Sequence, residues 1–195
     1  MLRKDLFGLM HFARSLGLRI VLSSNGTLIT EDAARRLAEA GVSYAGISLD
    51  GPREIHDRFR GGMGCFDAAL KGIEACQSAG LKTGLRFTMS RQNVDTVGEI
   101  FEIARQHGVR RICFYHLVRT GRAAADDLRP ATSGQIRAAL DEIITRTAES
   151  VLKGYAEEVL TVGNHADGPY LLLRMHRENH PQFQTARDLL LRSGG

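Results

Sequence analysis

Short apolar runs alternate along the chain with longer segments in which apolar residues recur every three or four positions. The apolar runs have the length of β-strands and end at polar residues; they span 18–22, 44–49, 82–89 and 111–118. The segments between them follow helical periodicity, as at Phe66, Ala69, Leu70, Ile73 and Cys76. Strands that alternate with helices predict a parallel sheet with helices packed on its outside.

The pattern changes after Val118. A polar loop over 120–130 precedes a long amphipathic helix, and a short strand over 159–162 is followed by a loop at 164–168. Pro181 suits the first turn of a last helix, because its missing N–H costs nothing there. This second half therefore predicts a mainly helical extension.

About four strand–helix units are visible, whereas a closed eight-stranded barrel needs about 250 residues and the chain has 195. We therefore expect an α/β fold with an open, partial barrel over residues 1–130 and a helical extension over 131–195. Thr30 and Asn93 stand just before helical segments, where side-chain oxygens commonly accept from the first free backbone N–H groups. Both are predicted helix N-caps.

Composition excludes several classes of protein. The chain is 43% hydrophobic and 25% charged, and no apolar run approaches the roughly 20 residues of a membrane span. The first residues lack the long apolar core of a signal peptide, so we expect a cytoplasmic protein without membrane contact. The net charge of +4 is spread along the chain without a basic block and interleaved aromatics, which disfavours nucleic-acid binding but suits an anionic ligand.

The three cysteines, Cys65, Cys76 and Cys113, are far apart in the sequence and lack the spacing of metal ligands. Cys76 falls on the apolar face of a helical segment and Cys113 lies in an apolar strand, so both are expected to be small core residues. The sequence therefore predicts neither a disulfide framework nor a metal site on this chain.

Polar residues follow the apolar strands, and in parallel sheets the carboxyl ends of the strands bind ligands. Ser48 and Asp50 point to one face of a strand and suit hydrogen bonds to a ribose, although a simple turn explains them equally well. Arg58 and Arg60, in a segment predicted to be a loop, could bind a carboxylate or phosphate or could simply be solvated. Arg86 interrupts an apolar strand and therefore needs a charged partner or a ligand.

Other candidates carry a weaker signal. Asn25 and Thr27 form a polar turn that either caps a helix or lines the mouth of the sheet. His116, near the end of a strand, is either a hydrogen-bonded core residue or a substrate contact. His165 and Asp167 lie close together in a loop and could form an acid–base or metal-binding pair.

Several motifs, in order, resemble those of the radical S-adenosylmethionine (SAM) enzymes. They are Ser24–Thr27, Ile47–Gly51 and His56–Gly61, supported by Phe66–Ala69 and Met89–Asn93. In the second half, 116–122 and 160–170 resemble the branch with an extra C-terminal cluster (SPASM-like) domain, and within it the proteins of heme d1 biosynthesis.

The resemblance implies a partial (β/α)6 barrel that binds SAM and a [4Fe-4S] cluster and generates a 5′-deoxyadenosyl radical. Ser48 and Arg60 would contact the ribose or the methionine carboxylate of SAM, and Leu117 would pack on its adenine. The mouth of the barrel would be lined by Asn25, Thr27, Asp50 and Arg86. The substrate would be a modified tetrapyrrole near His116, His165 and Asp167, and an electron donor protein would be a partner.

The sequence departs from the family pattern at two points. It contains neither the Cys-x3-Cys-x2-Cys loop that holds the catalytic cluster nor the Gly-Gly-Glu-Pro segment that grips SAM. We therefore expect a fragment, truncated at the N-terminus of the barrel and before the auxiliary-cluster domain, which carries no cluster and is inactive alone. An exposed strand edge at 18–22 would then favour self-association.

Three alternative functions stay open at this point. The chain could belong to a peptide-maturing enzyme of the same branch, or it could be a non-catalytic module that binds SAM. An ordinary aldolase or isomerase barrel is disfavoured, because Lys82 begins its strand and so lies away from the expected ligand end.

Overall fold

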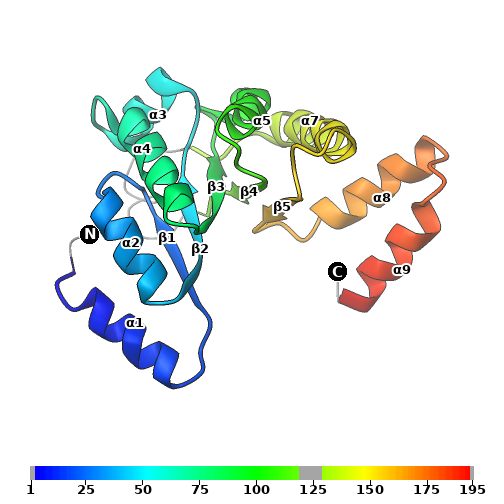
Figure 1. The fold of residues 1–195 in the computed structure, drawn as a ribbon. Helices are drawn as coiled ribbons and strands as arrows, with labels where there is room; N and C mark the ends of the chain where they lie inside the picture. Colours follow the sequence, from blue (N-terminus) through cyan, green and yellow to red (C-terminus); the bar gives the residue numbers. More distant parts are fainter. Residues whose placement is uncertain (1–2, 119–128, 194–195) are drawn as a thin grey trace.

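The computed structural model describes residues 3–118 and 129–193, and these form an α/β fold (Figure 1). Its five-stranded sheet is parallel throughout, in the spatial order β1-β2-β3-β4-β5. The strands are β1 (Ile20–Ser24), β2 (Val42–Ser48), β3 (Lys82–Met89), β4 (Arg111–His116) and β5 (Glu158–Val162). The predicted parallel α/β architecture is confirmed, and β5, from the segment 131–195, joins the sheet beside β4.

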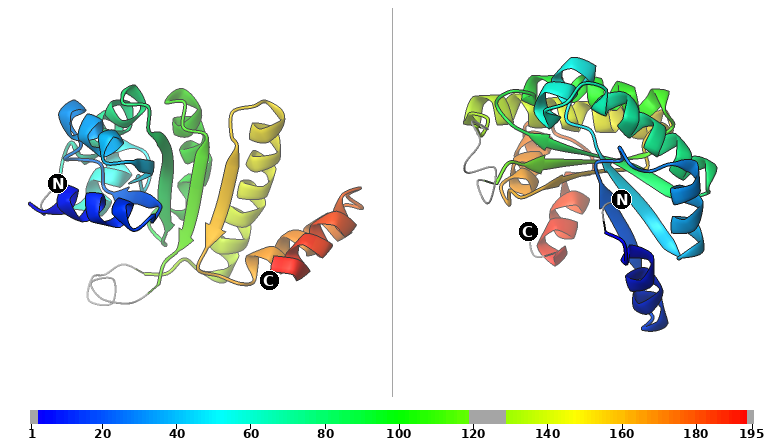
Figure 2. Two further views of the ribbon diagram at one scale, coloured as in Figure 1. Left: turned by 60° about the horizontal axis from the view of Figure 1, so that its bottom comes forward. Right: turned by 90° about the vertical axis from the view of Figure 1, so that its left-hand side faces the viewer.

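Helices cover one face of this sheet. The right-hand view of Figure 2 shows α4, α5 and α7 together on that face. The helical elements are α1 (Leu6–Ser15), α2 (Glu31–Glu39), α3 (Arg53–Arg60), α4 (Cys65–Ser78), the 3-10 turn η1 (Val94–Thr96), α5 (Val97–Gln106), α7 (Ser133–Leu152), α8 (Asp167–Arg177) and α9 (Phe183–Ser193).

Alternation along the strands separates the core from the opposite face. On β3, Leu85, Phe87 and Met89 are buried on the helix-covered side, where the Phe87 ring meets that of Phe114 edge-on with centroids 5.8 Å apart. The residues between them point the other way, because successive side chains alternate across a strand. We call this second side the inner face; it carries Tyr44, Gly46, Ser48, Gly84, Arg86, Thr88, Cys113 and Tyr115.

Local predictions were confirmed at Thr30 and wrong at Asn93. The Thr30 hydroxyl accepts from the Ala33 N–H at 3.2 Å and so caps α2. Asn93 makes no side-chain cap; its amide is used instead at the ends of β2 and β3. Capping was the expected use of such a residue, but the buried backbone groups beside Asn93 offered stronger partners.

Two helices were not predicted. The segment with Arg58 and Arg60, expected to be a loop, forms α3, which ends at Gly61 in the left-handed conformation with φ 71°. The loop predicted at 164–168 is cut short, because α8 begins at Asp167. Only α3 is mostly polar; α8 carries apolar residues such as Leu171 and Met175, and its start lies in an Asn-, Asp- and Gly-containing segment that favours a loop.

Strand β1 forms one edge of the sheet, as the exposed-edge prediction requires, and Val21 is 55% exposed there. Whether this edge drives self-association stays a prediction. No helix in the described ranges 3–118 and 129–193 is long and apolar enough to cross a membrane.

Gly72, on α4, lies where no side chain fits. A Cβ atom on Gly72 would meet the carbonyl oxygen of Gly26 and lie 3.1 Å from its carbonyl carbon, and backbone cannot easily move aside. We expect Gly72→Ala to lower the free energy of unfolding by about 1–3 kcal/mol, measured by urea denaturation.

The matched control is Gly134→Ala on α7, where nothing lies within 4 Å of the added atom. Because alanine is the better helix former, this control should be neutral or slightly stabilising. Equal midpoints for the two variants would show that α4 does not pack against the turn after β1 as described.

Candidate functional site

The carboxyl ends of the strands converge on one buried carboxylate, that of Asp50. One carboxylate oxygen of Asp50 accepts from the Arg60 guanidinium of α3, and the other accepts from the Thr88 N–H of β3 at 2.9 Å. Asp50 is fully buried, whereas the Arg60 side chain is 30% exposed. Burial raises the pKa of the Asp50 carboxyl, and the Arg60 charge and the Thr88 N–H oppose that rise. Asp50 thus ties β2 to β3 and α3.

Asn93 closes the same corner from the next connection. Its Nδ2 donates to the Asp50 carbonyl at 3.0 Å and to the Thr88 carbonyl at 2.9 Å. Its Oδ1 accepts from the N–H of Ser90 at 2.8 Å and from the Ser90 hydroxyl at 2.9 Å. Backbone groups that would lie unpaired beyond the strand ends are therefore satisfied by one side chain.

In the His56–Gly61 motif, His56 and Asp57 stabilise the fold by binding backbone N–H groups. The Nδ1 atom of His56 accepts from the Asp50 N–H at 2.9 Å, which requires the neutral, Nδ1-unprotonated ring. Burial, followed by the nearby Arg60 charge, lowers the pKa of His56 to about 4. Asp57 accepts from the N–H groups of Gly64 and Phe66 at the start of α4, and these bonds lower its pKa.

Other predicted mouth residues keep polar groups available. Asn25 accepts through Oδ1 from the Thr27 N–H and hydroxyl, which leaves its amide nitrogen without a partner among the described residues. The Ser48 hydroxyl, at the end of β2, likewise has no hydrogen bond to any described residue. Leu117 is partly buried directly after β4. Two donors and one apolar surface therefore stand at this end of the sheet.

Arg86 lies across the inner face. Its guanidinium carbon is 4.5 Å from the centroid of the Tyr115 ring, and no carboxylate within 3–118 or 129–193 forms an ion pair with it. Of the two alternatives that the sequence left open for Arg86, the structural ion pair is not found among these residues, and its guanidinium instead contacts an aromatic ring.

The sequence suggested that His165 and Asp167 act together, but the structure pairs Asp167 with His116. The His116 Nε2 lies 2.8 Å from an Asp167 oxygen, and Asn164 donates to the other oxygen at 2.9 Å. The two paired side chains are 12% and 7% exposed, whereas His165 is exposed. This pair could not be predicted from the sequence, because the two residues are 51 positions apart and only the adjacency of β4 and β5 brings them together.

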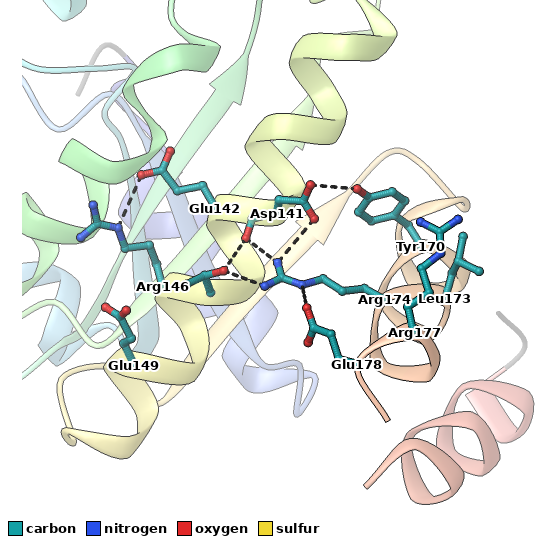
Figure 3. A pocket seen from close by; sticks show the side chains of 10 residues that line it. Asp141, Glu142, Arg146, Glu149, Tyr170, Leu173, Arg174, Arg177 and Glu178 are labelled. Atoms are coloured by element: carbon teal, nitrogen blue, oxygen red, sulfur yellow. Dashed lines mark hydrogen bonds and ion pairs between the residues drawn. The ribbon is translucent and has the colours of Figure 1, made fainter. Parts of the chain in front are cut away.

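A cavity of about 820 Å³ lies outside this mouth, between α7 and α8. Figure 3 shows that its charged side chains largely bind one another. Arg174 donates to the Asp141 carbonyl at 2.7 Å, the Thr145 hydroxyl at 2.9 Å and Glu178 at 2.8 Å, and the Tyr170 hydroxyl donates to Asp141 at 3.0 Å. These bonds hold α8 against α7, so the cavity is better explained as part of the packing contact between the two helices than as a reactive site.

The cysteines do not fit an iron–sulfur cluster. Cys76 is buried on α4 on the helix-covered side, Cys113 is buried on the inner face of β4, and Cys65 begins α4. No group of three possible metal-ligating side chains occurs in the part of the chain that the structure describes. A [4Fe-4S] cluster needs several thiolates held close together, and these three belong to separate surroundings.

Comparison with known proteins decides the family. The family model described as the radical SAM superfamily matches residues 1–104. The chain belongs to the radical SAM superfamily. The resemblance drawn from the sequence motifs is thus confirmed.

Two curated relatives extend the likeness over nearly the whole chain. Fe-coproporphyrin III synthase of Methanosarcina barkeri is 46% identical over 194 residues, which cover 100% of this chain and 49% of that protein. Pre-heme d1 synthase of Dinoroseobacter shibae is 38% identical over 187 residues, which cover 95% of this chain and 46% of that protein. This radical SAM chain therefore spans about half the length of the curated relatives it matches.

A solved structure supports the fold at low identity. The crystal structure of Streptococcus suis SuiB superposes with a TM-score of 0.67 at 15% identity, covering 86% of this chain and 38% of that one. The five-stranded arc of this chain thus recurs in a larger protein.

The neutral His56 predicts how the stability of this radical SAM chain depends on pH. Its pKa of about 4 in the folded chain lies below the ordinary 6.5, so its stabilising contribution is present above pH 6.5 and is lost as the pH falls toward 4. A shift of this size amounts to at most roughly 3 kcal/mol. Urea midpoints measured from pH 7.5 to 4.5 should fall accordingly.

His56→Gln should be less stable at pH 7.5 but should show a flatter decline toward pH 4.5. The control His165→Gln removes an exposed ring and should keep the wild-type slope. A His56→Gln slope equal to that of the wild type would rule out His56 as the cause.

Proposed function

We propose that this chain supplies the SAM-binding arc of a radical SAM enzyme that modifies a tetrapyrrole in heme d1 biosynthesis. The observation that carries the proposal is the likeness to Fe-coproporphyrin III synthase and pre-heme d1 synthase along almost every residue of the chain. Both names refer to products built on tetrapyrroles. The enzyme would work in the cytoplasm with an electron donor protein.

Donors at the mouth support SAM as the cofactor. The Ser48 hydroxyl and the Asn25 amide lie at the carboxyl ends of neighbouring strands and are not used by described residues. Hydroxyl and amide donors suit the ribose hydroxyls and the methionine carboxylate of SAM. Leu117 offers an apolar contact for adenine, and Thr27 shares the turn with Asn25.

The Asp50–Arg60 pair qualifies the proposed role of Arg60. The guanidinium is held by Asp50 and yet remains 30% exposed, so it can present its outer N–H groups to a ligand while Asp50 fixes its position. Asp50, which is fully buried, then acts on the ligand only through Arg60. SAM would supply the chemistry of hydrogen abstraction when bound in a cluster-containing enzyme.

The described residues of this chain do not account for that cluster, so we propose that the chain is inactive when alone. Within the SAM-binding arc, its own residues bind and orient the cofactor. The exposed His165 would stand beside the substrate. His116, held by Asp167, instead pairs in register with Met89 and so lies on the other side of β4 from the inner face.

SAM affinity tests the cofactor assignment. We expect the chain to bind SAM in calorimetric titrations, and Ser48→Ala to weaken binding about fivefold through loss of one hydrogen bond. The matched control is Ser43→Ala, at the amino end of the same strand, where the hydroxyl binds the Ile20 carbonyl at 2.9 Å.

Equal losses for Ser43→Ala and Ser48→Ala would mean that SAM does not bind at the mouth. Submicromolar SAM binding by the isolated chain, together with no affinity for any tetrapyrrole, would favour a non-catalytic SAM-binding module. Binding of a precursor peptide in place of a tetrapyrrole would favour a peptide-maturing enzyme.

A further inference from the structure

The inner face of the sheet carries a positive charge that the described protein does not balance. Arg86 is partly buried at the centre of this face, opposite Ser48 on one side and Cys113 on the other. Within residues 3–118 and 129–193 it contacts an aromatic ring but forms no ion pair. A partly desolvated guanidinium without a carboxylate is costly unless a ligand supplies the anion.

The neighbouring phenols do not balance this charge either. Burial raises the pKa of Tyr115 to about 12, with a further rise from the neighbouring Cys113. Burial likewise raises the pKa of Tyr44, although the nearby Arg111 charge opposes the rise. Both tyrosines are therefore neutral at physiological pH, and Arg86 remains a net positive charge.

Two glycines leave room on the inner face for the Arg86 and Tyr44 side chains. A Cβ atom on Gly46 would lie 2.8 Å from the Arg86 Cδ and 3.2 Å from Cε1 of Tyr44. A Cβ atom on Gly84 would collide with the Tyr44 hydroxyl and lie 2.9 Å from its ring carbon Cζ. Gly46 and Gly84 are paired across β2 and β3, so the side chains of Arg86 and Tyr44 can lie along the sheet there.

Two guanidinium–ring pairs result, and we call this part of the inner face the floor. The Arg86 guanidinium lies over the Tyr115 ring, and the Arg111 guanidinium lies over the Tyr44 ring with its carbon 4.8 Å from the centroid. Arg111 is neutralised by Glu158 at 2.8 Å, so the unbalanced charge of the floor is that of Arg86. Toward the amino ends of the strands, Tyr44 also lines a cavity of about 720 Å³, together with Arg19 and Lys82.

We propose that this floor is the substrate-binding surface, on which a flat macrocycle stacks while Arg86 binds one of its peripheral carboxylates. The assignment rests on the proposed function, because it takes the tetrapyrrole from there. Aromatic rings and guanidinium groups favour a planar π-system, and a guanidinium binds a carboxylate through two parallel N–H groups. Charge and shape thus select a planar polycarboxylate.

The methionine carboxylate of SAM is the other anion that could reach Arg86. Ser48 and Asn25 serve SAM at the strand ends, whereas Arg86 lies on β3 three residues before its last residue, Met89. A ligand that contacts Arg86 must therefore lie over the sheet itself. A planar macrocycle can extend over the floor in this way, whereas the methionine part of SAM is small and not planar.

Binding of coproporphyrin III to the whole 195-residue chain tests the proposal. This probe has four carboxylates, and its tetramethyl ester keeps the macrocycle but removes their charge. Fluorescence titration should show that Arg86→Gln weakens coproporphyrin III binding about tenfold, as expected for loss of a charged hydrogen-bonded pair. Affinity for the tetramethyl ester should be the same in the variant and the wild type.

Two further variants distinguish the effect of the Arg86 charge from an effect of the substitution on folding. Arg86→Lys keeps the charge without the forked geometry and should recover part of the affinity. Arg35→Gln removes an exposed guanidinium of α2 and should bind coproporphyrin III as the wild type does. Thermal melts followed by circular dichroism report whether each variant is folded, and Arg86→Lys remains informative if Arg86→Gln is not.

The outcomes distinguish this inference from the proposed function. Equal coproporphyrin III affinity for Arg86→Gln, Arg86→Lys and wild type would overturn the role of Arg86 while leaving a tetrapyrrole enzyme intact. A loss of SAM affinity in Arg86→Gln without loss of porphyrin affinity would assign the anion to SAM and also overturn it. A wild-type chain that binds no porphyrin would remove the tetrapyrrole assignment itself.

Discussion

The geometry of the strand ends depends on the buried carboxylate of Asp50. It sits just beyond β2, yet its bonds reach the N–H of Thr88 on β3 and the guanidinium of Arg60 on α3. Its own backbone is fixed from two more places, by His56 and by Asn93. Removing one partner of a buried, hydrogen-bonded ion pair typically costs about 3–5 kcal/mol, so this corner is held together or lost together.

This arrangement explains why the His56–Gly61 motif is so polar although part of it is buried. His56 accepts from the Asp50 backbone, Asp57 binds the start of α4, and Arg60 balances the Asp50 charge. Each polar group is buried because it binds a specific backbone or charged partner. Only the outer part of Arg60 remains for a ligand, so the motif is mostly a scaffold for the mouth of the sheet.

The sequence predicts the strands well because their signal is local. β3 begins and ends where the apolar run at 82–89 does, and Thr30 caps α2 as its position indicates. The two helices that were not predicted, α3 and α8, begin in segments whose local composition favours turns, and their tertiary contacts, such as Arg60 with Asp50 and Arg174 with Asp141, are recorded in no local pattern. Among the site residues, the sequence marked Ser48 and Asp50 as polar groups at the end of one strand, but it could not show that Arg60 and Thr88 bind Asp50.

Longer-range pairings were beyond the sequence for the same reason. His116 and Asp167 are separated in sequence by all of α7 and by β5, and only the parallel pairing of β4 with β5 brings them within 2.8 Å. The Arg86 charge was recognisable from the sequence because a charged residue interrupts an apolar strand. Its surroundings were not, since they depend on two glycines in other strand positions and on a tyrosine from the next strand.

The two ends of this face therefore differ in the groups that they offer to a ligand. At the strand ends, Asp50 and Asn93 leave few unsatisfied groups, and the donors that remain are the neutral ones of Ser48 and Asn25 and the outer N–H groups of Arg60. Farther down the face, the glycines on β2 and β3 remove side chains so that aromatic rings and a cation can lie flat. A sheet that only supported the mouth would fill those positions with packed apolar residues. The sequence places Gly46, Gly84 and Arg86 there instead, which fits a surface shaped for a ligand.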